Sequence, residues 1–151
     1  MANTQSMCTS FKGELLVGHH NFGTGVTRGS TAADTFKAAL YLASATVNAS
    51  TTAYSATNEV SGTGYTAGGV TVTFGTAPST SGTTAFVTPS ASITYTTVTL
   101  STAFDAVLLY NSTQSNKAVS VHTFGSQTVT AGTFTLTMPV NDASTGLIRL
   151  A

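Results

Sequence analysis

The chain has 151 residues, a formal net charge of zero and only 7% charged residues, against about 25% in ordinary domains. This length predicts one domain, large enough to bury a core without disulfides or metal. The neutral balance argues against a nucleic-acid binder and against a polybasic membrane anchor, because both need clustered Lys and Arg. Cys8 is the single cysteine, which excludes an internal disulfide.

Small residues fill the place of the missing charges. The sequence holds about 32 Thr, 20 Ala, 17 Ser and 14 Gly, together more than half of the chain. Threonine is β-branched and fits a pleated, half-solvated surface, so this composition favours strands over helices. The surface must then be wetted by hydroxyls rather than by ions, and a net charge near zero promotes association. We therefore expect a protein that works inside an assembly.

The first 33 residues of the chain differ from the rest. Residues 1–33 are predicted to form an extended N-terminal arm with a first short strand, ahead of a β-sandwich domain over residues 34–151. The opening residues lack the basic start and apolar stretch of a signal peptide, so synthesis in the cytoplasm is expected. Residues 11–17 form an isolated apolar run in this segment. We expect an apolar anchor on a partner surface, made by Phe11, Leu15, Leu16 and Val17; the alternative is that the run is simply the first strand of the sandwich.

The pattern downstream is that of short strands. Residues 35–47 fit either a helix or a strand, and the β character of the rest favours a strand. Apolar residues alternate with threonine over residues 70–74 and 133–138, as in antiparallel sheets with one solvated face. The polar stretch 111–116 predicts a hairpin turn. Further strands are predicted over residues 92–100, 104–110, 117–124 and 146–150. The whole predicts an all-β fold, an antiparallel β-sandwich of jelly-roll type.

The residues that could carry chemistry form no convincing site. Gly62–Ala67 matches the G-x-G-x-x-A dinucleotide pattern, but that pattern needs a following helix, and here a strand follows. His19 and His20 are adjacent, so on a strand they would point to opposite faces and could not share a metal. There is no G-x-S-x-G elbow, and the carboxylates are isolated. We expect no enzymatic activity, no cofactor and no metal, with each carboxylate pairing with Lys or Arg or capping a turn.

Five tyrosines remain to be explained. They could form a sugar-stacking surface, although core packing with hydroxyls at the rim is the more common use of this residue. They are Tyr41, Tyr54, Tyr65, Tyr95 and Tyr110.

Two stretches carry a resemblance to a known group. They are residues 39–73 and 106–150, with the motifs LY…SAT, EVSGTGYTAGG, LLYN, AV…FG and TAG-TFT-P. This pairing resembles small structural proteins of tailed bacteriophages, related to the capsid decoration, or cement, proteins that form jelly-roll-like sandwiches on the head. The motifs are structural features rather than catalytic signatures, so the resemblance implies no active-site residue in this chain.

The resemblance implies a viral structural protein. Its expected function is to bind the major capsid protein on the outside of the phage head and to bridge neighbouring subunits, which stabilises the shell. The expected partners are the capsid lattice and a second copy of the chain, as a homodimer or alternatively a homotrimer; nucleic acid and membrane are not expected. The alternative function is a head-fibre or tail receptor-binding module that recognises glycans.

Overall fold

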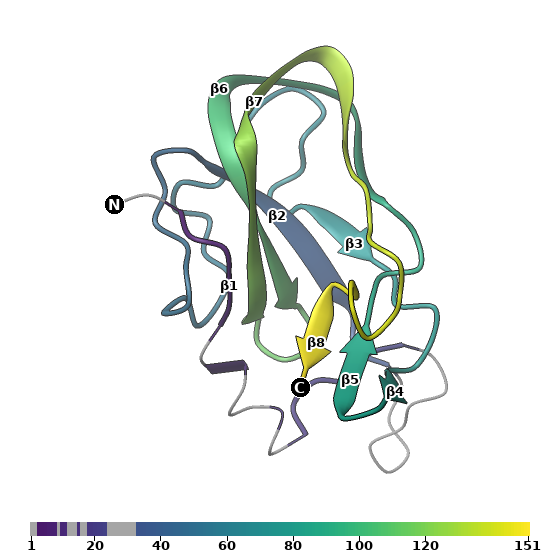
Figure 1. Ribbon diagram of the computed structural model, residues 1–151. Coiled ribbons are helices and arrows are strands. Elements are labelled where there is room, and N and C mark those ends of the chain that lie inside the picture. Colours follow the sequence, from purple (N-terminus) through teal and green to yellow (C-terminus); the bar gives the residue numbers. More distant parts are fainter. Residues whose placement is uncertain (1–2, 9, 12–14, 16–17, 24–32) are drawn as a thin grey trace.

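The computed structural model describes residues 3–8, 10–11, 15, 18–23 and 33–151. In this part of the chain the strands form two antiparallel sheets. Ser10, Phe11 and Leu15 are helical, so the alternative of a first strand over residues 11–17 is wrong at Phe11 and Leu15. The larger sheet has five strands in the order β1-β7-β6-β2-β3, and the smaller has the order β4-β5-β8 (Figure 1). The bounds are β1 Ser6–Met7, β2 Phe36–Leu42, β3 Val70–Val72, β4 Ser79–Ser81, β5 Thr84–Val87, β6 Ile93–Asn111, β7 Lys117–Leu136 and β8 Ile148–Leu150.

A long bent hairpin, β6–β7, spans the molecule. Its strands have 19 and 20 residues and pair from Asn111↔Lys117 beside the turn to Ile93↔Leu136 at the open end. Figure 1 shows both strands rising from the turn, arching over the top and descending towards the small sheet. The arch coincides with several shifts of register, because β-bulges increase local twist and bend. We call residues 93–104 and 125–136, beyond the arch, the outer arms of the hairpin.

Two non-glycine residues take left-handed backbone conformations on the outer arms. Thr97 has φ 54° and Ala131 has φ 45°, and they flank the shifted pairing of Val98 with Gly132. Such conformations are costly for residues with a Cβ and persist only where the surroundings over-determine them. The bend is therefore fixed by the pairing of the hairpin rather than by glycine.

The core lies mainly between the two sheets and is rich in phenylalanine. The rings of Phe22 and Phe36 stack at 4.5 Å between centroids, and Phe74 meets both edge-on at 4.9 and 5.1 Å. Val87 from β5 and Ile148 from β8 join the same buried cluster. The opposite face of the large sheet is covered by residues 43–69, where Tyr54 stacks on Tyr110 at 4.7 Å.

The sequence predicts most of these strands, with three corrections. The ambiguous stretch 35–47 is a strand over its first half, so the strand interpretation is confirmed there. The separate strands predicted over 92–100 and 104–110 are one strand, β6, and those over 117–124 and 133–138 are one strand, β7. Continuous pairing across the bulges joins them. The hairpin β4–β5 is not among the predicted strands, because its strands are only 3 and 4 residues long and carry little pattern.

The glycines of the 62–69 loop allow close backbone contacts. A Cβ at Gly62 would lie 2.1 Å from the Thr99 carbonyl oxygen of β6, and one at Gly69 would lie 1.7 Å from the Ala38 oxygen of β2. Gly69 also has φ +70°. The loop therefore lies directly against two strands, and the formal dinucleotide pattern is a sandwich-corner loop followed by β3.

We predict that Gly69→Ala destabilises the fold by more than about 2 kcal/mol, because the new methyl group collides with backbone and the φ is unfavourable. Gly125→Ala is the matched control, since a Cβ there meets nothing within 4 Å. Urea unfolding of both variants measures the difference. Equal stabilities would contradict the close-contact role of Gly69.

Candidate functional site

A single carboxylate, Glu59, organises the tyrosines. Its Oε2 accepts a hydrogen bond from the Tyr54 hydroxyl at 2.7 Å, and its Oε1 accepts from the Tyr65 hydroxyl at 2.7 Å and from the Gly68 N–H at 2.8 Å. The expectation that isolated carboxylates pair with Lys or Arg is wrong here: Glu59 is satisfied by neutral donors. Asp142 does cap a turn, where it accepts from the Ser144 and Thr145 N–H groups.

The tyrosine hydroxyls complete the edge of β2. β3 pairs with β2 only from Phe36 to Ala38. Beside this short pairing the Tyr95 hydroxyl donates to the Ala38 carbonyl at 2.9 Å, and the Leu40 N–H donates to the Tyr65 oxygen at 3.0 Å. The side chains thus satisfy backbone groups that a longer β3 would have paired.

All five tyrosines point inward. Tyr41, Tyr95 and Tyr110 are buried, the other two are half-buried, and every hydroxyl has an internal partner. Burial raises the pKa of Tyr41 to about 12 and raises the pKa of the other four as well, so the hydroxyls stay protonated donors. The tyrosines therefore do not form an exposed sugar-stacking platform.

The predicted anchor residues lie in different places. Phe11 is fully buried in the core, where its ring meets His20 and Phe22 edge-on, and Leu15 packs half-buried against the same cluster. Leu16 and Val17 lie outside the described residues. The core position accounts for the hydrophobicity of Phe11 without a partner, and the anchor itself stays a prediction.

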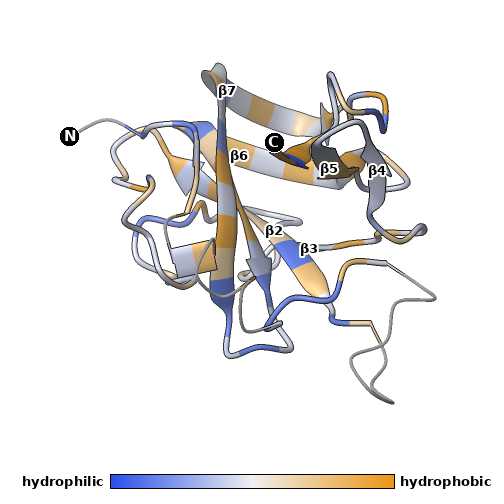
Figure 2. Cartoon of the chain, turned by 60° about the horizontal axis from the view of Figure 1, so that its bottom comes forward, coloured by the Kyte–Doolittle hydropathy of each residue, from blue (hydrophilic) through white to orange (hydrophobic). Residues whose placement is uncertain are grey.

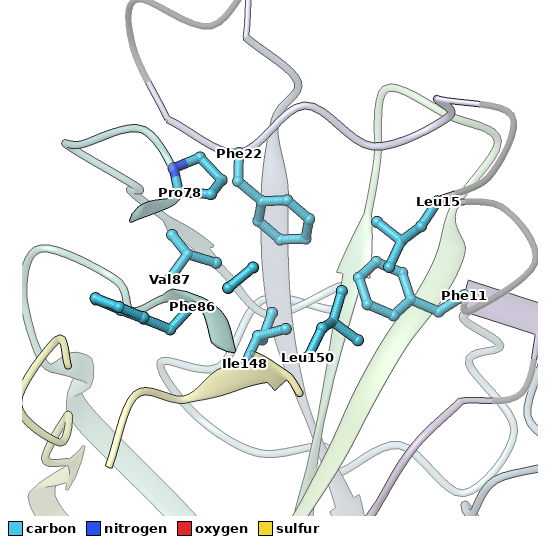
Figure 3. Close-up of a pocket in the computed structure, with 9 residues that line it drawn as sticks. Phe11, Leu15, Phe22, Pro78, Phe86, Val87, Ile148 and Leu150 are labelled. Atoms are coloured by element: carbon cyan, nitrogen blue, oxygen red, sulfur yellow. The ribbon is translucent and has the colours of Figure 1, made fainter. Parts of the chain in front are cut away.

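A small apolar cavity adjoins these two residues. It has a volume of about 120 Å³ and lies between the N-terminal segment and the small sheet. Figure 3 shows Phe11 and Leu15 on one side, Val87 and Phe86 on the other, and Ile148 and Leu150 of β8 below. The lining side chains offer no polar or charged group for chemistry.

The described part of the N-terminal segment is tied to the body. β1 pairs with β7, and the Asn3 side chain contacts Asp105 and the Val47 N–H. Further along, the Asn111 amide bridges Asp34 at 2.7 Å and the His20 ring at 3.1 Å. These contacts hold described residues from both ends of the segment against the sandwich.

A serine and a histidine lie in contact on β7, Ser120 and His122. Ser120 Oγ lies 2.9 Å from His122 Nε2, and the histidine ring lines an apolar cavity of about 210 Å³ under the hairpin. Burial lowers the pKa of His122 to about 4, so the ring is neutral near pH 7. Ser120 itself is 3% exposed and does not line the cavity, so the pair is not presented to a substrate there.

The outer arms of the hairpin present a surface without charged residues. Between Glu59 and Asp105, and again between Lys117 and Asp142, the sequence has no charged residue. In Figure 2 the arms are mostly pale or orange. We call the exposed residues of the arms the outer hairpin surface: Thr96, Thr97, Ser101, Thr102, Ala103, Gly125, Ser126, Gln127, Thr128, Thr130, Ala131, Thr133 and Thr135.

Comparisons with family models, curated proteins and solved structures find no significant match. In the described ranges, no three His, Cys, Asp or Glu side chains are grouped so as to hold a metal ion. Across the same ranges, no helix is both long and apolar enough to span a membrane.

We predict that Glu59→Gln lowers the free energy of unfolding by about 1–3 kcal/mol, because an amide cannot accept all three hydrogen bonds. Tyr54→Phe removes one of the donors alone and should cost less. Urea unfolding of the two variants and of the double variant measures the coupling between the side chains. Additive effects would show that the contact between Glu59 and Tyr54 contributes nothing.

The neutral His122 predicts a loss of stability in acid. The unfolded chain binds a proton near pH 6.5, whereas the folded chain resists protonation until about pH 4. The histidine contribution is therefore complete above pH 6.5 and is lost as the pH falls towards 4. Between these values the wild type should lose on the order of 2 kcal/mol more than His122→Gln. Unfolding curves at pH 7 and pH 4 test this, and equal losses would contradict it.

Proposed function

We propose that the chain is a structural protein of a tailed-bacteriophage virion, a decoration or cement protein on the outside of the capsid. In this role it binds the major capsid protein, bridges neighbouring subunits and associates with a second copy of itself. It is made in the bacterial cytoplasm and acts without catalysis or cofactor. The proposal includes the finer fold, a jelly-roll type of sandwich with an N-terminal arm.

The outer hairpin surface carries this proposal. It is exposed, it lies on two long paired strands, and its polar side chains are hydroxyls and one amide rather than ions. Burying an ion against another protein costs desolvation unless it is paired, whereas a hydroxyl needs only one or two hydrogen bonds. Such a surface suits a protein–protein contact whose affinity comes from the buried surface area rather than from ion pairs.

Binding to two neighbouring subunits of a capsid would strengthen the attachment further. A standard protein interface buries on the order of 1,600 Å² in total. Where one molecule contacts two neighbouring capsid subunits, the second contact forms at high effective concentration, so modest contacts give firm attachment. A rigid molecule is required for this, and the long paired strands of the β6–β7 hairpin support that requirement.

The glycan-binding alternative has less support. Aromatic side chains that stack on sugars must be exposed, and the tyrosines face the interior. The two large hydrophobic residues that stand out from the described surface, Val140 and Leu150, are aliphatic.

We predict that the wild-type protein co-sediments with empty heads of the phage that encodes it, and that the double variant Ser101→Lys/Thr102→Lys loses most of this binding. Both positions are exposed on β6, so the fold should persist, while two lysines add charges that the contact must desolvate. Thr80→Lys on exposed β4 is the matched control and should bind normally.

Two results would reject this function. One is a wild-type protein that stays in the supernatant of intact heads. The other is binding to host cells with a specific glycan-array signal, which favours the receptor-binding alternative.

A further inference from the structure

One side of β7 has no strand partner over most of its length. β6 pairs along one side, while on the other β1 reaches only Ser120 and Val121. The Gln5 side chain then accepts from the Thr123 N–H at 3.5 Å. From Phe124 to Leu136, no strand within the described ranges pairs with this side. The backbone groups of such an edge are open to pairing with another strand.

This edge lacks the usual protection. Natural sheets block their edges with charged side chains, with proline or by keeping the edge strand short. Here the whole stretch is free of charge, and Pro139 lies beyond the end of β7. The other edge strands are protected: β3, β4 and β8 have three residues each, and β8 carries Arg149. Several register shifts bend this edge of β7, which keeps consecutive pairs with β6 at Phe134–Leu136 and single pairs at Gly132, Val129 and Gln127.

We propose that the outer edge of β7, Phe124–Leu136, pairs antiparallel with the same edge of a second copy about a two-fold axis. In such an isologous contact, a charged residue near the axis would face its own equivalent at short range. An edge without ions meets no such repulsion. The proposal rests on the self-association included in the proposed function, but it does not need the capsid.

The contact area fits a reversible dimer. Thirteen residues at about 3.4 Å each would span at most roughly 40 Å, less along this bent edge, and a strip about 12 Å wide buries at most on the order of 1,000 Å² over both copies, the low end for specific interfaces. A strand laid on this edge would also cover more of the half-buried Phe134 and Leu136. We therefore expect a dimer that dissociates on dilution.

Single cysteines locate the axis. The natural Cys8 is fully buried, so a cysteine placed on the surface is the one exposed thiol among the described residues. The scan uses Thr128→Cys, Thr130→Cys, Thr133→Cys and Thr135→Cys. Mild oxidation should give the highest yield of disulfide-linked dimer at the position nearest the axis. The yield should fall sharply at positions further from it. Cross-linking equal to that of the exposed control Thr71→Cys on β3 would overturn the proposal.

Sedimentation equilibrium of the purified protein is the second measurement. The wild type should be a concentration-dependent dimer, and Thr130→Lys/Thr133→Lys should raise the dissociation constant at least tenfold, while Thr71→Lys leaves it unchanged. A wild type that is monomeric at every soluble concentration, or a dimer unaffected by the lysines, would overturn the proposal. Capsid binding does not enter these experiments, so this proposal and the proposed function can fail separately.

Discussion

The hydrogen bonds of Glu59 are the interaction on which the arrangement of the large sheet depends. One carboxylate accepts from two tyrosines and a glycine N–H, all within the 43–69 segment, and one of these tyrosines, Tyr65, accepts in turn from the Leu40 N–H of β2. Without this link, the Leu40 N–H would lose the Tyr65 hydroxyl that satisfies it at an incomplete sheet edge. A charge-assisted hydrogen bond is about twice as strong as a neutral one, which suits a chain with so few charges.

The same scarcity of charged side chains determines the character of the protein surface. Ordinary domains keep their surfaces soluble with lysine and glutamate, whereas the arms of this hairpin rely on threonine and serine hydroxyls. This leaves a surface that desolvates at small cost and an edge that lacks electrostatic protection. Both features suit the proposed contacts with other proteins.

The sequence predicts the class of fold because the alternation of apolar residues and threonine is unambiguous over stretches such as 70–74 and 133–138. It cannot predict the arch, because residues 97 and 131 are neither glycine nor asparagine and nothing local marks their positive φ. The sequence identifies the glycines of residues 62–69 as loop residues. It does not identify the backbone atoms that they contact, which lie on strands distant in the sequence. The expected Lys or Arg partner of Glu59 is wrong, since hydroxyl donors from positions 54 and 65 meet the carboxylate only after the loop has closed. Phe11 belongs to an apolar run that would suit a core or an interface equally. The sequence cannot distinguish the two, because burial is set only when the chain folds.

The length of the β6–β7 hairpin also bears on how the chain reaches its native state. Its strands are joined by the five-residue turn Ser112–Asn116, where Ser115 and Asn116 have positive φ and the Asn111 side chain accepts from two N–H groups. Closing so short a loop costs little entropy, so pairing can begin at the turn and extend outward. The contacts of β2 with β6 and of β1 with β7 bridge far longer separations and must wait for that platform. The connectivity of the chain therefore favours one order of folding. The β6–β7 hairpin forms first, and the N-terminal strands pair with it last.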